Sequence, residues 1–262
     1  MNKKNEIDKN GWLLVKSVFS PEEIESFRAL AIQSKDHQGD VLSHPKLKKV
    51  LMDERILNIF KETLGSDSLF YFGDSLISIN GPGGGFHKDS PGRMDKNSFE
   101  WKDPNYSVVR MGIYLQDHSK HSYGLCLREK SHLTQSVAKG KIINVKTEPG
   151  DVVLWKLTTT HAANALVLAA LPQVSFHPLI ARMFPKLMLQ PKIEPRVAIF
   201  ATFGIDDHYS REFVNYLKTR KYAVNRWEHT RYGLADIEDM KSKGVDVLTD
   251  FQLEVLVRSE LV

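Results

Sequence analysis

The sequence is almost free of cysteine: Cys126 is the only one in 262 residues. An internal disulfide therefore cannot form, and a zinc site built from several cysteines is excluded. Long apolar runs are also missing, since no stretch reaches the roughly 18 consecutive apolar residues of a membrane-spanning helix. The charged N-terminal residues lack the apolar stretch of a secretory signal. We therefore expect a cytoplasmic protein with no transmembrane segment.

Charge of one sign is not concentrated anywhere in the chain. The 36 basic and 32 acidic residues leave a net charge of +4, and no long basic run occurs. Nucleic acid is therefore not an expected partner. With 42% hydrophobic and 26% charged residues, the composition is that of a folded globular domain rather than a disordered chain. Composition says nothing about the oligomeric state.

The beginning of the chain has a strong helix-start signal. Residues 11–19 form a short apolar run that ends at Ser20, which is an N-cap residue. Pro21 suits the first helical position, and Glu23 completes a capping box. The apolar residues that follow are spaced as in one face of a helix: Ile24, Phe27, Leu30 and Ala31. A second helix is predicted over residues 47–64.

From residue 67 onward the pattern changes to short apolar segments rich in β-branched and aromatic residues. Strands are predicted over residues 68–79, 107–116, 124–128, 141–145, 151–157 and 196–204. Turns such as Glu148-Pro149-Gly150-Asp151 separate them. Because no helices alternate with these strands, they favour two packed sheets over a parallel α/β sheet. We predict a mainly β fold with flanking helices, the double-stranded β-helix or jelly roll of cupin-like proteins.

We expect one domain over residues 1–262. Residues 1–66 form its helical N-terminal part, 67–205 the jelly-roll core, and 206–262 a helical C-terminal extension. Residues 166–191 are an apolar, proline-containing insertion in the core. Four interpretations of this insertion stay open: a lid over the mouth of the barrel, an interfacial segment, a dimer contact, or an extra helix that completes the core.

The tripeptide His87-Lys88-Asp89, directly after Phe86 and a glycine run, is the main chemical signal. In an extended segment, residues two apart project from the same face, so His87 and Asp89 can point at one metal ion. An imidazole, a carboxylate and a distant second histidine make the set that holds iron(II) and leaves coordination positions open. Alone, this pattern is weak, because most such pairs are solvated loop residues.

Two distant residues complete a candidate site. His161, 74 residues beyond His87, follows the predicted strand 151–157 and is the best-placed third ligand. Arg196 opens the last apolar strand, and its planar guanidinium suits the second carboxylate of a dicarboxylate cosubstrate. The simpler interpretations are a buried structural histidine and a surface ion pair.

Other polar residues are less informative. His118 and His121 have the spacing of some zinc sites, but no neighbouring ligand completes a set. His132 is interpreted as structural. Lys88, Arg93 and Arg110 are candidates for contact with an anionic substrate, although charged residues beside a loop are usually solvated.

Several short motifs follow one another in a fixed order along residues 9–204. They are the segments 8–15 and 18–24, Phe86-His87-Lys88-Asp89, segment 113–117 leading to 124–127 and 130–132, segment 149–155, and His161. In this order they resemble the phytanoyl-CoA dioxygenase family of iron(II)/2-oxoglutarate oxygenases. The whole series is specific, whereas no single piece is.

The resemblance implies that His87, Asp89 and His161 bind iron(II) and that Arg196 binds 2-oxoglutarate. It implies a dioxygenase that uses O2 and 2-oxoglutarate to hydroxylate a small molecule of lipid, sugar or natural-product type, with release of succinate and CO2. In related halogenases a small residue replaces the carboxylate ligand. The presence of Asp89 therefore favours hydroxylation or a related oxidation over halogenation.

The chain departs from the family pattern at two places. His161 and Arg196 are 35 residues apart, which is longer than usual, and removal of the insertion 166–191 restores the expected spacing. Arg182, inside the insertion, is the alternative candidate for binding 2-oxoglutarate if Arg196 does not. Ala163 stands two residues after the distal histidine, where the family often has a hydroxyl residue that contacts the cosubstrate.

Two other functions stay open. A cupin-like metal-dependent isomerase or epimerase would act without 2-oxoglutarate and would use a third histidine near the His87–Asp89 pair, which the sequence lacks. A catalytically silent binding module of the same fold is the other alternative. All three candidate metal ligands and a candidate cosubstrate-binding arginine are present, which argues against the loss of catalytic activity.

Overall fold

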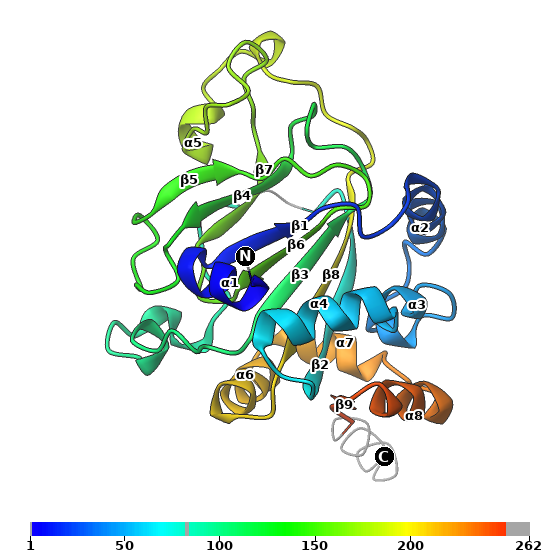
Figure 1. Ribbon diagram of the computed structural model, residues 1–262. Helices are drawn as coiled ribbons and strands as arrows, with labels where there is room; N and C mark the ends of the chain where they lie inside the picture. Colours follow the sequence, from blue (N-terminus) through cyan, green and yellow to red (C-terminus); the bar gives the residue numbers. More distant parts are fainter. Residues whose placement is uncertain (1, 82–83, 250–262) are drawn as a thin grey trace.

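Two β-sheets form the centre of the computed structural model, which describes residues 2–81 and 84–249 (Figure 1). One sheet has six strands in the order β1-β6-β3-β8-β2-β9, and the other has three in the order β5-β4-β7. Apart from the parallel pair β2–β9, neighbouring strands are antiparallel. The fold is a jelly roll with flanking helices, which confirms the predicted fold class.

The strands are β1 (Trp12–Val15), β2 (Leu69–Ile79), β3 (Val109–Tyr114), β4 (Gly124–Glu129), β5 (Lys141–Asn144), β6 (Val152–Lys156), β7 (His161–Ala165), β8 (Val197–Gly204) and β9 (Val245–Val247). The α-helices are α1 (Lys3–Asn10), α2 (Pro21–Gln33), α3 (Lys48–Leu51), α4 (Glu54–Leu64), α5 (Pro178–Ala181), α6 (His208–Lys218), α7 (Lys221–Glu228) and α8 (Leu234–Ser242). Every predicted strand segment overlaps an observed strand. No helix in this part of the chain is both long and apolar enough to cross a membrane.

The structure differs from the sequence prediction at several elements. The region predicted as one helix over residues 47–64 is two helices, because Asp53 accepts a hydrogen bond from the Arg55 amide and thereby caps a new helix, α4. Strands β7 and β9 and helix α1 are additional elements. The C-terminal helices α6 to α8 lie within the predicted helical extension, whose residues 250–262 fall outside the described part of the chain.

The predicted start of helix α2 is confirmed in atomic detail. The Ser20 hydroxyl accepts a hydrogen bond from the Glu23 amide, and the Glu23 carboxylate accepts one from the Ser20 amide. Such a cap satisfies amides that have no partner within the helix. The helix then buries Ile24, Phe27 and Ala31, as the apolar spacing predicts.

Two apolar clusters divide the interior. The larger one lies between the six-stranded sheet and the helices, where Phe60 of α4 packs on Phe203 of β8 at a ring distance of 4.4 Å. The smaller one lies between the two sheets, around Tyr114, Leu127 and Trp155. Tyr114, Leu125 and Trp155 of this second cluster, with Phe200 packed against it, also line the cavity described below.

Strand β2 contains a bulge that matters for the site. Its register against β8 shifts between Tyr71 and Ser75, and Gly73 within this stretch has a φ of 63°. Glycine tolerates this left-handed conformation without strain. The indole N–H of Trp227 in α7 donates to the Gly73 carbonyl, so the bulge is held by the C-terminal helices.

The insertion 166–191 protrudes beyond the three-stranded sheet at the top of Figure 1. It contains only one short α-helix, α5, and seven of its large apolar side chains are exposed. The interpretation as an extra helix that completes the core is therefore wrong. Helix α5 is too short, and the insertion buries too little of its apolar surface.

His118 has a structural environment rather than that of a zinc ligand. The Gln116 side-chain amide donates to Nε2 of His118, and Nδ1 of His118 donates to the Ser122 carbonyl. Both ring nitrogens are thus engaged in the neutral form. Burial lowers the pKa of His118 to about 4, and the carbonyl contacts offset only part of this shift. His132, predicted to be structural, is also buried and bonds the Asp8 carbonyl.

The buried neutral His118 predicts acid sensitivity. In the unfolded chain this histidine takes up a proton near pH 6.5, whereas in the folded chain it does so only near pH 4. Its contribution to stability is therefore present above pH 6.5 and is lost as the pH falls toward 4, by at most about 3 kcal/mol. Denaturant unfolding from pH 8 to 4 should show a smaller pH-dependent loss in His118→Gln than in wild type. Identical slopes would contradict this prediction.

Candidate metal centre

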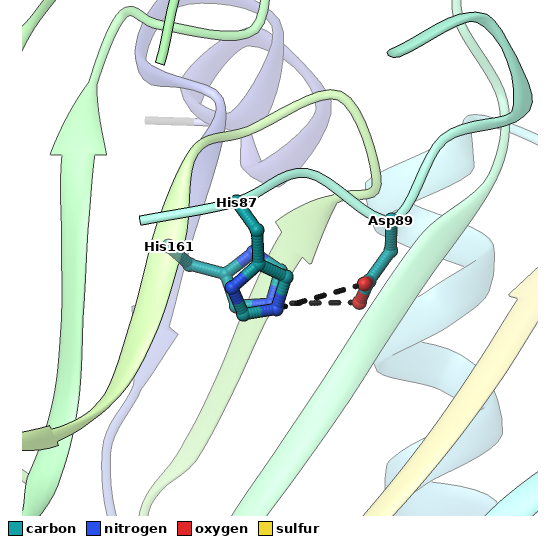
Figure 2. Close-up of side chains that lie close together, drawn as sticks. All are labelled: His87, Asp89 and His161. Carbon is teal, nitrogen blue, oxygen red and sulfur yellow. Dashed lines mark ion pairs between the residues drawn. The ribbon is translucent and has the colours of Figure 1, made fainter. Parts of the chain in front are cut away.

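Three side chains distant in sequence converge at the open side of the barrel. Figure 2 shows the imidazoles of His87 and His161 close to the carboxylate of Asp89, with the two rings tilted by 53° relative to each other. Nε2 of His87 lies 3.7 Å from Oδ1 of Asp89, and Nε2 of His161 lies 3.4 Å from Oδ2. One potential ligand atom of each residue lies within 4.8 Å of the others. Ligand atoms about 2.1 Å from a shared metal are about 3 Å apart or more, so this spacing suits one ion.

The backbone sets this convergence. The amides and carbonyls of His87 and His161 exchange two hydrogen bonds of 3.0 and 2.9 Å, and the Asp89 amide donates to the Leu157 carbonyl. The segment 87–89 therefore continues the edge of the sheet next to β7. Its alternation puts His87 and Asp89 on one face, as the sequence spacing predicts. Lys88 points the other way and is buried, with Nζ donating to the carbonyls of Ser131 and Thr158.

The histidine rings are oriented for metal binding through Nε2. Nδ1 of His87 lies 2.9 Å from the Gly85 carbonyl, and Nδ1 of His161 lies 3.1 Å from the Thr159 carbonyl. A carbonyl can only accept, so in a neutral ring Nδ1 carries the proton and Nε2 presents a lone pair. Metal-ligating histidines are typically fixed by this kind of outer contact.

The charge states also suit a cation. Burial alone would raise the pKa of Asp89, but the neighbouring Arg110 guanidinium outweighs it and holds the pKa well below the usual range. Partial desolvation lowers the pKa of His87, and the proximity of His161 lowers it further. An ionised carboxylate and a neutral imidazole are the forms that bind metals.

Arg110 of strand β3 connects the carboxylate of Asp89 to a buried ion-pair network. Its Nη1 donates to Oδ2 of Asp89 at 2.9 Å, and its Nη2 donates to Oδ2 of Asp74 at 2.5 Å. Asp74, in the β2 bulge, also accepts from Arg226 of α7 and from the Thr202 hydroxyl. Sequence reasoning missed Asp74 and Arg226, because no local motif marks residues that meet only through tertiary packing.

Of the three basic residues proposed near the motif, only Arg110 lines the cavity. Lys88 is directed away from it, and Arg93 donates to the Tyr216 hydroxyl. The interpretation of Lys88 and Arg93 as substrate contacts is therefore not supported by their positions.

The cavity has a volume of about 280 Å3. Its polar lining residues are the three converging residues together with Arg110, Arg196 and Ser78, and its apolar lining residues are Leu76, Tyr114, Leu125, Trp155, Ala163 and Phe200. Ala163 thus lies at the site but offers no hydroxyl. A mostly apolar cavity with a few convergent polar groups is typical of a small-molecule site.

Arg196 enters the cavity with an almost uncompensated charge. Its side chain is buried, at 6% exposure, and its guanidinium donates to the carbonyls of Tyr123 and Gly81 at 3.4 and 3.2 Å. No carboxylate in the described ranges lies within ion-pair distance of it. Burial lowers the pKa of Arg196. Arg182, the alternative candidate, is exposed on the insertion and does not line the cavity.

Comparison with known proteins supports the fold but shows no family. No family model matches the sequence, and no curated protein matches it, so the resemblance to the phytanoyl-CoA dioxygenase family stays a prediction. The solved structures include many similar folds.

Three similar structures illustrate the likeness. The non-heme alpha-ketoglutarate-dependent epimerase SnoN from nogalamycin biosynthesis is 14% identical, with a TM-score of 0.54 over 77% of this chain and 81% of that chain. EctD from S. alaskensis with bound Fe is 15% identical, with a TM-score of 0.53 over 78% and 75%. HygX from Streptomyces hygroscopicus with nickel and 2-oxoglutarate is 15% identical, with a TM-score of 0.54 over 79% and 87%. At these identities the likeness shows the fold alone.

Proposed function

We propose that the chain is an iron(II)- and 2-oxoglutarate-dependent oxygenase. In this proposal His87, Asp89 and His161 hold the metal, and Arg196 binds the far carboxylate of 2-oxoglutarate. One observation carries it: two imidazole Nε2 atoms and an ionised carboxylate converge in a cavity that also contains a buried guanidinium. The fold shared with EctD with bound Fe and with HygX with 2-oxoglutarate supports the same chemistry.

The donor set fits iron(II). Two neutral imidazoles and one carboxylate occupy one side of an ion and leave its other side open toward the cavity. When bound, the iron would couple the decarboxylation of 2-oxoglutarate, to succinate and CO2, to oxidation of the substrate by O2. The protein holds the ligands in place through backbone contacts and covers the site with an apolar wall that limits water.

The cavity also fits a dicarboxylate. A buried charge is costly without a partner, so the Arg196 guanidinium favours an incoming carboxylate. Gly81 leaves the space that such a group needs, because a Cβ there would lie 2.6 Å from the Ser78 hydroxyl and 3.0 Å from Nη2 of Arg196. We assign the Ser78 hydroxyl to the same carboxylate. The Ser78 hydroxyl can donate a hydrogen bond to this carboxylate, whereas the methyl side chain of Ala163 cannot.

Arg110 acts as a positioning residue for Asp89. Because Arg110 donates to Oδ2 of Asp89, Oδ1 of Asp89 is left for the metal. The same guanidinium donates to Asp74 and so connects the two carboxylates. Arg226 and Thr202 in turn fix Asp74. A ligand whose rotamer is locked in this way loses less entropy when the metal binds.

The reaction that we favour is hydroxylation of a small molecule. Asp89 supports it over halogenation, because the carboxylate occupies the place a halide would need. SnoN, described as an epimerase that depends on alpha-ketoglutarate, makes epimerisation with the same cosubstrate the alternative outcome. An isomerase that works without 2-oxoglutarate is disfavoured, since the metal-ligand group in the described residues contains no third histidine.

Iron binding is tested by anaerobic titration of the full chain with iron(II) and 2-oxoglutarate. The wild type should develop the weak visible charge-transfer band of the chelate, and His161→Ala should lose it because the metal loses a ligand. Release of succinate in the presence of candidate substrates then follows turnover. A wild type without the band, or a variant that keeps it unchanged, would refute the metal assignment.

Cosubstrate binding is tested with two arginine variants. Arg196→Gln removes the charge that faces the cavity and should weaken 2-oxoglutarate binding about 30-fold or more, the effect of losing a buried charged contact of about 2 kcal/mol. Arg182→Gln is the matched control and should bind normally. Iron affinity, measured separately, should be similar in both. If Arg182→Gln were the weaker binder, the assignment of Arg196 would be wrong.

The role of Arg110 predicts both a stability and a binding effect. Arg110→Gln leaves two buried carboxylates with less compensation and should lower the free energy of unfolding by about 3 kcal/mol. Arg110→Lys keeps the charge but cannot span both carboxylates, so it should recover part of the stability while iron affinity stays about tenfold low. Arg231 is exposed and, within the described part of the chain, donates to the nearby carbonyls of Glu228 and Thr230, so Arg231→Gln is the control. Wild-type iron affinity in Arg110→Lys would exclude a positioning role.

A further inference from the structure

Exposed apolar side chains are concentrated on the insertion 166–191. Of the fourteen large apolar side chains found exposed in the described residues, seven lie between residues 171 and 188. They are Leu171, Val174, Leu179, Ile180, Met183, Leu187 and Met188. The most exposed are Met183 at 82% and Leu187 at 89%. Apolar patches of this kind usually mark an interaction surface rather than chance exposure.

The insertion has a small apolar interior of its own. The rings of Phe176 and Phe184 meet edge to face at 5.3 Å, and Ala181 is buried. At its base, the amide of Ala169 donates to the Met188 carbonyl, and the amide of Gln190 donates to the Val167 carbonyl. The segment is therefore a structured protrusion that turns part of its apolar side chains inward and the rest outward.

The charges of this segment have one sign. Residues 166–191 contain no aspartate or glutamate, whereas the exposed Arg182 and Lys186 directly precede the exposed Met183 and Leu187. Apolar side chains interleaved with cations are typical of segments that enter the interface of an anionic membrane. A symmetric contact between two copies of the insertion would bring its cations together without acids to compensate them.

The protrusion also lies next to the entrance of the cavity. The ring of His177, which caps helix α5, packs edge to face on Phe86 at 5.2 Å. Phe86 directly precedes His87, whose side chain is 48% exposed. Figure 1 shows the protrusion at the opposite end of the molecule from α4, α7 and α8. A surface that binds the protrusion would therefore face the open side of the site and not the helical side.

We propose that the insertion 166–191 docks the protein on the surface of an anionic lipid bilayer. The exposed apolar side chains around Met183 and Leu187 enter the headgroup region, and Arg182 and Lys186 contact lipid phosphates. This docking holds the entrance of the cavity close to the membrane. It is independent of the iron and 2-oxoglutarate assignments.

The test is co-sedimentation of the full chain with vesicles, without added metal or cosubstrate. Vesicles of phosphatidylcholine alone are compared with vesicles that also contain phosphatidylglycerol. We expect binding only to the anionic vesicles, and weaker binding at high salt. The double variant Arg182→Gln, Lys186→Gln should lose about fivefold in affinity for each charge removed. The double variant Met183→Asn, Leu187→Asn should lose at least tenfold.

The chain offers matched controls on other faces. Met94 and Leu234 are 83% and 80% exposed, so Met94→Asn and Leu234→Asn remove equally exposed apolar side chains outside the insertion and should leave vesicle binding unchanged. Lys46→Gln with Lys221→Gln is the corresponding charge control, since both lysines are exposed.

Three outcomes would overturn the proposal. They are absence of binding, equal binding to neutral and anionic vesicles, and an equal loss in the control variants. Analytical ultracentrifugation distinguishes a further case: a dimer that Met183→Asn, Leu187→Asn dissociates, without vesicle binding, would identify a second copy as the occupant. Because the assay contains no iron, its failure leaves the proposed oxygenase function untouched.

Discussion

The site depends on the pair of backbone hydrogen bonds that His87 and His161 exchange. These bonds join two segments 74 residues apart and make the two imidazoles neighbours. The amide of Asp89 adds a third bond to Leu157, and Lys88 anchors the opposite face of the same segment to the Thr158 carbonyl. Because backbone contacts hold all three candidate ligands, little conformational entropy is left to be lost on metal binding, which is the general advantage of a preorganised site.

The buried charges around the cavity explain why its candidate ligands are an ion and a dicarboxylate together. Asp74 and Asp89 pair with the guanidinium groups of Arg110 and Arg226, and Arg196 adds a third guanidinium without an ion pair, so this set has one excess positive charge. A divalent cation alone would increase the excess in a poorly solvated space. A dianionic cosubstrate would offset the charge of that cation, and Arg196, which has no ion-paired carboxylate among the described residues, is where we propose that its far carboxylate binds.

Much of the fold and the His87–Asp89 pair could be predicted from the sequence, because alternation and residue spacing are local properties. His161 is predicted from the order of the motifs along the chain and from the family resemblance. Strand β7 was less visible, since its sequence His161-Ala-Ala-Asn-Ala lacks β-branched and aromatic residues. The ion pairs of Asp74 with Arg110 and Arg226 join residues 36 and 152 positions apart and depend on a bulge that brings Asp74 into the site. Sequence periodicity does not predict ion pairs between such distant residues. Only the structure therefore shows which contacts hold the Asp89 side chain in position.

The size of the cavity bears on where a substrate is recognised. Its volume of about 280 Å3 lies at the lower end of small-molecule sites, and the proposed cosubstrate would fill part of it. The remaining contacts must then come from the rim, where His87 is exposed and where Phe86 meets His177 of the insertion. Bilayer docking through the insertion would place this rim at the lipid surface. Under that docking proposal, an amphipathic lipid is the substrate type, among those that the sequence leaves open, that would lie next to the rim.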